Sequence, residues 1–181
     1  MMVIPKQPEV LRVAVGRLWN GQSCPNERLG ALVELQQNER GVLMRVITRS
    51  LSSSKIPEAS VGSRVDGLWE YDVVELFVVD EDGQYLEVEL GVGGHYLVLG
   101  FDAPRHLVAD FADYSFETHH AVLADGRCVN EILIPRDLFP TSLKALNAYL
   151  IVGGQFLAHH PVPGQQPDFH QPKTFPFARL A

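Results

Sequence analysis

Hydrophobic and polar positions alternate with a period of two through most of this chain. Short runs rich in β-branched and aromatic residues recur, and turn residues separate most of them. This alternation is typical of strands with one face toward a core. The runs lie at Val10–Val15, Ala31–Leu35, Val42–Thr48, Val73–Val79, Tyr85–Leu90, His95–Phe101, Cys128–Ile134 and Tyr149–Gly154. The pattern predicts an all-β fold, a sandwich of jelly-roll-type antiparallel sheets or a barrel.

Few segments of the sequence indicate a helix or a long loop. Leu133–Phe139, in which Pro135 suits a helix start, and Ser142–Ala148 each offer a helical turn. Ser50–Asp66 is the longest candidate loop, and long loops in compact domains are often binding loops. The chain after Pro161 is too rich in proline for a central strand, so we expect it to wrap the surface and to end in an edge contact.

Composition narrows the class of protein. A chain of 181 residues, 46% of them hydrophobic, can bury one substantial core, so we expect a single domain over residues 1–181. The net charge of −7 argues against a nucleic acid or an anionic membrane as the partner. Cys24 and Cys128 are too few for a disulfide framework, and no stretch reads as a signal peptide or a membrane span. We therefore expect a cytoplasmic protein with free thiols.

The clearest local prediction is a hairpin around the turn Asp80–Gln84. Pairing Val79 with Tyr85 places alternate residues of the two strands on opposite faces. The core face then holds Val74, Leu76, Val78, Leu86, Val88 and Leu90. The other face holds Glu75, Phe77, Tyr85, Glu87 and Glu89. The hairpin thus predicts three carboxylates on the face away from the core.

In this register Glu75 lies directly opposite Glu89. Like charges across a strand pair repel, so the pair requires a cation, a hydrogen-bond donor, a shared proton or open water. The candidate basic partners in the sequence are Arg45, Arg49, His95 and Arg105. A solvated sheet face with ordinary charge pairs remains one interpretation, and a ligand site is the other.

Aromatic residues near this hairpin favour a ligand site. Trp69, Tyr71, Phe77 and Tyr85 lie on or beside it, and Asp66 is just upstream. The apolar C–H face of a pyranose stacks on an aromatic plane, while its hydroxyls need fixed acceptors and donors. Trp69 as an anchor in the core is the alternative to Trp69 as a sugar platform.

The stretch Asp66–Phe101 resembles the β-sandwich superfamily that contains family-nine carbohydrate-binding modules and DOMON-like domains. Asp66, Trp69 and Glu75 follow the order that those modules use for sugar contacts. LWEYDVVELF, QYLEVEL, HPVPG and PDFHQPKTF resemble more closely an uncharacterised family with bacterial and vertebrate members. The second tryptophan of the sugar-binding modules is missing, and the aromatic residues available in its place are Phe169 and Phe175. The resemblance implies a β-sandwich with a saccharide site.

Together these patterns predict a non-catalytic domain that binds a glycan or a small saccharide. Trp69 would stack on the sugar, and carboxylates would accept hydrogen bonds from its hydroxyls. His170 is held between Pro167 and Pro172, so it could lie over the acidic face. The predicted ligand-binding residues are Asp66, Trp69, Glu75, Tyr85, Glu87, Glu89, Phe169 and His170.

Several alternatives stay open. Paired carboxylates could act on a glycosidic bond, although we assign no catalytic residue. Haem could bind through Met44, as in some DOMON-like relatives, and calcium could bind at Asp80 and Asp82. A plain interaction module with an exposed sheet edge is a further reading. The histidine pairs at positions 119–120 and 159–160 point to opposite faces of their strands, so we predict no metal ligand set; the cofactor and the oligomeric state are left open.

Overall fold

The computed structural model describes residues 1–26, 28–49 and 53–181, and it confirms the all-β prediction. The strands of these residues are β1 (Met2–Ile4), β2 (Leu11–Val15), β3 (Arg17–Leu18), β4 (Ala31–Gln37), β5 (Gly41–Arg49), β6 (Val73–Asp80), β7 (Tyr85–Gly91), β8 (Tyr96–Ala103), β9 (His106–Ala109), β10 (Glu117–Val122), β11 (Arg127–Pro135), β12 (Leu143–Val152), β13 (Gln155–Ala158) and β14 (Ala178–Leu180). The helical segments of the same residues are two short 3-10 turns, η1 (Leu68–Glu70) and η2 (Pro172–Thr174). Within the described part of the chain, neither has the length or the apolar character needed to cross a bilayer.

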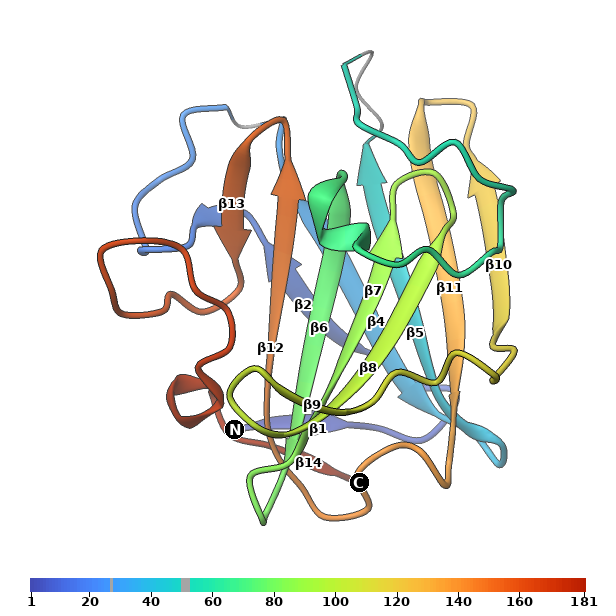
Figure 1. Cartoon of the computed structure of the whole chain (residues 1–181), viewed down its shortest axis with the longest axis vertical. Coiled ribbons are helices and arrows are strands. Elements are labelled where there is room, and N and C mark those ends of the chain that lie inside the picture. The colour runs from blue at the N-terminus through green and yellow to red at the C-terminus, as the bar shows by residue number, and fades with distance from the viewer. Residues whose placement is uncertain (27, 50–52) are drawn as a thin grey trace.

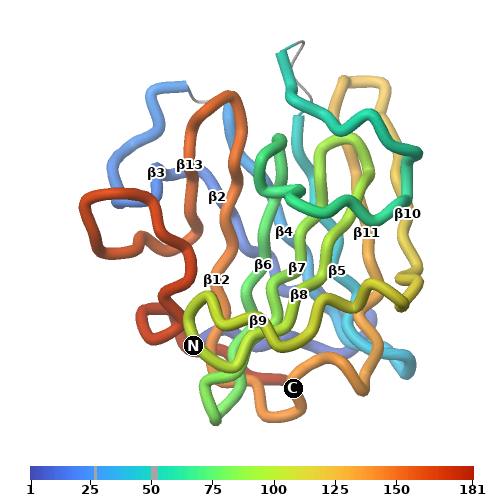
Figure 2. The backbone as a smooth tube through the Cα atoms, in the orientation of Figure 1, coloured from blue at the N-terminus to red at the C-terminus, as the bar shows by residue number. Residues whose placement is uncertain are grey.

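Two antiparallel sheets form the layers of a sandwich (Figure 1). One sheet has the order β10-β11-β5-β4-β2, and the other has the order β3-β13-β12-β6-β7-β8-β9. The tube view shows β12, β6, β7 and β8 crossing in front of β2, β4 and β5 (Figure 2). A small parallel pair, β1 with β14, brings the two ends of the chain together. The C-terminal edge contact predicted from the sequence is this pair.

The main core fills the space between the two sheets. Alternate residues of each strand point into it, as the period of two predicts. From the five-stranded sheet come Val13, Val15, Val33, Leu35, Met44, Val46, Ile132 and Ile134, and from the seven-stranded sheet come Val74, Leu76, Val78, Leu86, Val88, Leu90, Val98, Leu146 and Leu150. Because Met44 is fully buried here, it does not face the site described below.

The outer face of the seven-stranded sheet is buried as well, which the sequence did not predict. Turn η1 covers part of it, and residues 161–177, called here the C-terminal segment, cover another part. This second apolar cluster contains Leu68, Phe77, Tyr85, Leu97, Leu99, Phe101, Tyr149, Val162, Phe169 and Phe175. The sheet is therefore apolar on both sides, and the interpretation of a solvated outer face is wrong.

Of the two predicted helical turns, the one at Ser142–Ala148 is wrong, and the one at Leu133–Phe139 is confirmed only for the residues after Pro135. Ser142–Ala148 runs into β12, where pairing with β6 outweighs the helix propensity of its Leu, Ala and Lys residues. Strand β11 continues to Pro135, and the chain then makes a single turn in which the Phe139 N–H donates to the Pro135 carbonyl at 3.0 Å. The long loop predicted at Ser50–Asp66 is irregular from residue 53 onward, while its first three residues lie outside the described part.

Candidate functional site

The register of β6 and β7 is the one predicted from the sequence. Val79 pairs with Tyr85, Phe77 pairs with Glu87, and Glu75 pairs with Glu89. The three glutamates lie on the outer face, away from the main core, but they are buried: Glu75 is 3% exposed, Glu87 4% and Glu89 0%. Carboxyl groups this deep are rarely found without compensation, so their surroundings define the candidate site.

A pocket of ≈ 380 Å³ lies on this outer face. Glu75 and Glu87 lie on the sheet strands that form its floor, while η1, β9 and the C-terminal segment supply its walls. Its lining residues are Trp69, Glu75, Glu87, Leu99, Phe101, Arg105, Leu107, Ile151, Phe156, Pro167, Phe169 and His170. A mostly apolar lining with a few polar groups is typical of small-ligand sites.

Trp69 is presented to this pocket by its own turn. Gly67 takes a left-handed conformation, with φ 70°, that starts η1. Leu68 then points inward and is fully buried, whereas Trp69 is 47% exposed and lines the pocket. The alternative that Trp69 anchors the core is therefore wrong.

His170 is held in place at the edge of the acidic floor. Its Nδ1 lies 2.8 Å from the Tyr85 hydroxyl, which also accepts the Arg105 backbone N–H at 3.1 Å. Its own backbone N–H donates to Asp168, which pairs with the Arg105 guanidinium at 2.8 Å. The His170 Nε2 faces Glu87 Oε2 at 3.8 Å, which is beyond hydrogen-bond distance. One ring nitrogen is thus fixed while the other faces Glu87.

Burial dominates the protonation of these groups. It raises the pKa of Glu87 to about 8, an effect that the charge of Arg105 partly opposes. Burial also raises the pKa of Glu75 and of Glu89 well above their usual range, and the neighbouring carboxylates add to it. Burial, and to a smaller extent the positive charge of Arg105, lowers the pKa of His170 to about 4. At neutral pH the floor therefore retains protons on its carboxyl groups, and His170 is uncharged.

The structure brings most of the predicted residues together. Trp69, Glu75, Glu87, Phe169 and His170 line the pocket. Phe169 is also fixed from behind, because its ring stacks on Tyr149 with centroids 3.9 Å apart.

Three predicted residues lie elsewhere. Asp66 is exposed, forms an ion pair with Arg64 and is not part of the lining, because the turn at Gly67 separates it from Trp69. Tyr85 lies behind the pocket wall, where it orients His170 and stacks on Phe101. Glu89 lies beside Glu75 and Glu87 without lining the pocket.

Several lining residues were missed by sequence reasoning. Leu99 and Phe101 share the outward face of β8, which the period of two would have revealed. Ile151 and Phe156 are paired across the β12–β13 hairpin, which Gly153 and Gly154 mark in the sequence. Of the suggested cationic partners, Arg105 is the one that reaches the pocket, while Arg45 pairs with glutamates of the other sheet.

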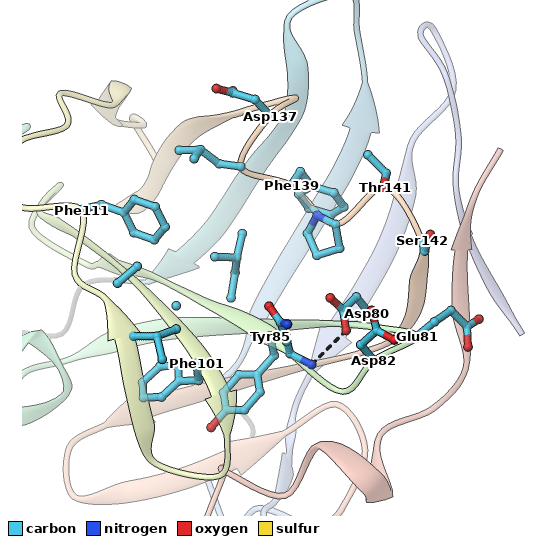
Figure 3. A pocket seen from close by; sticks show the side chains of 17 residues that line it. Asp80, Glu81, Asp82, Tyr85, Phe101, Phe111, Asp137, Phe139, Thr141 and Ser142 are labelled. Atoms are coloured by element: carbon cyan, nitrogen blue, oxygen red, sulfur yellow. Dashed lines mark hydrogen bonds between the residues drawn. The ribbon is translucent and has the colours of Figure 1, made fainter.

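A second pocket, of ≈ 430 Å³, lies at the far end of the same hairpin (Figure 3). Its acidic residues Glu81, Asp82 and Asp137 are exposed. Asp80 Oδ1 accepts the Gln84 N–H at 2.9 Å and so stabilises the turn. Solvated carboxylates at a hairpin tip require no ligand, and we therefore place the candidate site at the buried glutamates.

No family model matches the chain. Among curated proteins, the mouse UPF0462 protein C4orf33 homolog is 33% identical over 172 residues, which cover 88% of this chain and 87% of that protein. The chain belongs to the UPF0462 family. Other UPF0462 relatives are the zebrafish homolog, 30% identical over 84% of this chain and 82% of its own length, and the human protein, 29% identical over 84% and 79%. The predicted likeness to an uncharacterised family with vertebrate members is thereby confirmed.

Among solved structures, a Bacteroides uniformis protein described as a candidate carbohydrate-binding protein has the same fold as this UPF0462 chain. The TM-score is 0.73, the identity is 16%, and 99% of each chain is covered. At this identity the likeness supports the sandwich fold alone. The narrower resemblance to family-nine modules and DOMON-like domains stays a prediction.

Proposed function

We propose that this protein is a non-catalytic domain that binds a small saccharide or the end of a glycan in the pocket beside Trp69. The observation on which this rests is the half-exposed Trp69 ring on the wall of a pocket whose floor holds two buried carboxyl groups, Glu75 and Glu87. An exposed indole beside fixed polar groups matches a sugar, which has one apolar face and a rim of hydroxyls. The description of the Bacteroides uniformis protein supports the same ligand class.

Each polar group of the pocket has a defined part in this proposal. Glu75 and Glu87 keep protons at neutral pH, so each carboxyl can accept one hydroxyl hydrogen bond and donate another. The Arg105 guanidinium lines the rim and offers further donors. With the Tyr85 hydroxyl donating to Nδ1, the His170 Nε2–H faces Glu87 as one more donor. The apolar residues around them exclude water and strengthen these bonds.

Hydrolysis of the bound sugar is disfavoured by the placement of the same carboxyl groups. Glu75 and Glu87 project from the same face of neighbouring strands, with carboxylate oxygens within 4.8 Å of each other. A glycosidase requires two carboxyl groups that flank the scissile bond. Groups that approach a ligand from one side can orient it without supplying both an acid and an opposing nucleophile.

Calorimetric titration of a panel of monosaccharides and disaccharides tests the proposal. At least one sugar should bind the wild type, and Trp69→Ala should weaken that binding by about tenfold or more, which corresponds to about 1.4 kcal/mol. Phe177→Ala is the matched control, because Phe177 is a 67% exposed aromatic residue outside the pocket. Binding that survives Trp69→Ala unchanged, or that Phe177→Ala weakens equally, would contradict the proposal.

A further inference from the structure

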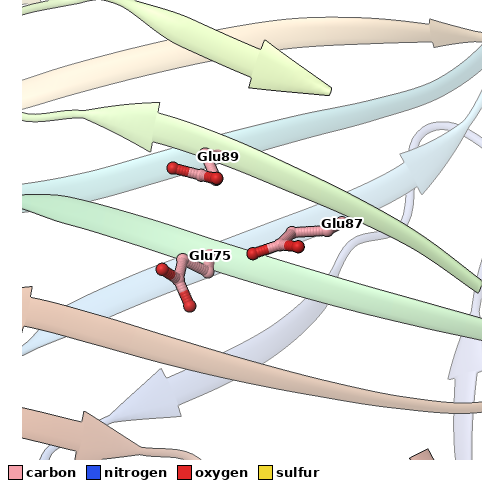
Figure 4. A group of neighbouring side chains, drawn as sticks. All are labelled: Glu75, Glu87 and Glu89. Atoms are coloured by element: carbon pink, nitrogen blue, oxygen red, sulfur yellow. The ribbon is translucent and has the colours of Figure 1, made fainter. Parts of the chain in front are cut away.

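The burial of Glu89 is not explained by saccharide recognition. Its side chain is fully buried, it does not line the pocket, and neither carboxyl oxygen has a hydrogen-bond partner among the described residues. Figure 4 shows its carboxyl group gathered with those of Glu75 and Glu87 on one side of β6 and β7. A buried carboxyl group without a partner is costly, so something is expected to pair with it.

The basic side chains named as candidate partners form no hydrogen bond with Glu89. His95 Nε2 lies 2.9 Å from the Ala59 carbonyl oxygen, and its Nδ1 has no hydrogen-bond partner among the described residues. Arg105 lies at the pocket rim and is paired with Asp168. His170 faces Glu87 rather than Glu89, and its buried ring is uncharged at neutral pH. Arg45 is paired with Glu34 and Glu131 on the other sheet. Two ways to offset the repulsion between the facing carboxylates therefore remain, a cation from solution and shared protons.

The geometry of the three glutamates suits a metal ion. One carboxylate oxygen from each of Glu75, Glu87 and Glu89 lies within 4.8 Å of the others. Calcium binds oxygen at about 2.3–2.6 Å, so two oxygens on opposite sides of one ion are about 4.6–5.2 Å apart. Donors no more than 4.8 Å apart can therefore reach the same ion with small shifts of their side chains.

The donor type and the access path narrow the class of ion. All three donors are carboxylates, which select hard cations such as Ca²⁺, Mg²⁺ and Mn²⁺ over softer ones. Ca²⁺ tolerates irregular geometry, whereas Mg²⁺ requires a near-ideal octahedron. Glu75 and Glu87 line the pocket, so an ion can enter through it and complete its coordination with water.

We propose that Glu75, Glu87 and Glu89 bind one Ca²⁺ ion on the outer face of β6 and β7, at the floor of the pocket beside Trp69. Binding converts the three carboxyl groups to carboxylates with release of their protons, so affinity increases with pH. The ion gives Glu89 the partner that the described residues do not supply. This site shares Glu75 and Glu87 with the saccharide pocket, and with Ca²⁺ bound these two groups can accept hydrogen bonds from a sugar but cannot donate them. The two proposals can still be tested apart, because Glu89 lies outside the pocket and Trp69 does not belong to the ligand set.

Chelator-treated protein titrated with CaCl₂ at pH 8, with MgCl₂ and MnCl₂ for comparison, tests this site. One Ca²⁺ per chain should bind by calorimetry, and the Tm should rise by about 5–10 °C at a hundredfold excess over the Kd. Glu89→Gln should abolish both effects, whereas Trp69→Ala should keep both while losing saccharide binding. The two proposals can therefore fail separately.

A second variant guards against misfolding of the first. If Glu89→Gln does not fold, Glu87→Gln replaces it, with the same expected loss of Ca²⁺ binding. A wild type that gives neither heat nor a Tm shift with Ca²⁺ would overturn the proposal and assign the compensation to shared protons. Ca²⁺ binding that persists in the glutamine variant would overturn it as well.

Discussion

Glu75 on β6 lies directly opposite Glu89 on β7, and both side chains are buried although they lie on the face away from the main core. A cross-strand pair of carboxyl groups is stable in such a place only when protons, donors or cations offset the repulsion. The covering by η1 and the C-terminal segment therefore makes the protonation of this pair a determinant of stability as well as of binding.

Stability measured in the presence of a chelator should fall as pH rises from about 6.5 to 8. Burial raises the pKa of Glu87 from 4.5 to about 8, so the folded protein keeps a proton that the unfolded chain has released in this window. Folding then takes up a proton, and the free energy of unfolding decreases with pH by on the order of 1–2 kcal/mol from Glu87 alone. Glu75 and Glu89 act in the same direction.

His170 contributes with the opposite sign at lower pH. Burial lowers the pKa of His170 from 6.5 to about 4, so between these values the unfolded chain binds a proton that the folded ring does not. The free energy of unfolding therefore decreases as pH falls through this range. Above pH 6.5 the ring is mostly uncharged in both states, and His170 has little effect on the pH dependence. Urea melts between pH 6.5 and 8 thus isolate the glutamates from His170. In Glu87→Gln the free energy of unfolding should decrease less steeply with pH than in the wild type. A wild-type free energy of unfolding that is constant or rises between pH 6.5 and 8 would show that burial does not raise the pKa of these glutamates.

Neighbouring residues of η1 should respond to truncation in opposite ways. Leu68→Ala removes a fully buried side chain and should cost ~2–5 kcal/mol, with saccharide affinity preserved in the folded fraction. Trp69→Ala removes a half-exposed ring and should change stability by less than about 1 kcal/mol while binding is lost. Denaturant melts and sugar titrations of both variants distinguish the two effects. A large destabilisation by Trp69→Ala would show that the ring packs in the core.

The hydroxyl of Tyr85 should matter for stability and for the orientation of His170. Tyr85→Phe leaves the Arg105 N–H and the His170 Nδ1 without this partner, and we expect a loss of ~1–3 kcal/mol. Urea melts measure the loss, and Tyr114→Phe, at an exposed position, is the control. NMR of the His170 ring nitrogens should show a changed tautomer in Tyr85→Phe, and an unchanged ring would argue against the contact.

Asp66→Ala should leave saccharide affinity within about twofold of the wild type. The Asp66 side chain is exposed and paired with Arg64, and such surface pairs contribute about 0–1 kcal/mol to stability. Calorimetric titration of the variant with the sugar that binds best is the measurement. A loss of saccharide affinity as large as that of Trp69→Ala would show that Asp66 contacts the sugar, as the family resemblance implies.

The strands and the β6–β7 register were predictable because both depend on local pattern. Alternation with a period of two sets the faces, and the Asp80–Gln84 turn fixes which residues pair. The pattern could not show that the outer face is covered, since Leu68 and Phe169 meet there from segments about 100 residues apart in the chain. It therefore predicted on which face Glu75 lies but not that its side chain is buried.

Spacing alone also misplaced two features. Asp66 and Trp69 are close in sequence, but the left-handed Gly67 lies between them and the two side chains do not share the pocket. Ser142–Ala148 has helix-forming composition, yet its residues from Leu143 onward pair with β6, and Ala145 also bridges to Phe177. In both cases backbone geometry or tertiary pairing, which composition does not encode, decided the structure.

Indole NMR is the most direct test of the saccharide pocket. The chain contains two tryptophans, so the amide spectrum has two indole N–H signals, and the one missing from Trp69→Ala is that of Trp69. Trp19 is not among the lining residues. Titration with the saccharides of the panel should shift the Trp69 signal in a saturable way while the Trp19 signal stays in place. If every sugar leaves the Trp69 signal unmoved, or if a bound sugar shifts Trp19 alone, the pocket beside Glu75 and Glu87 is not a saccharide site.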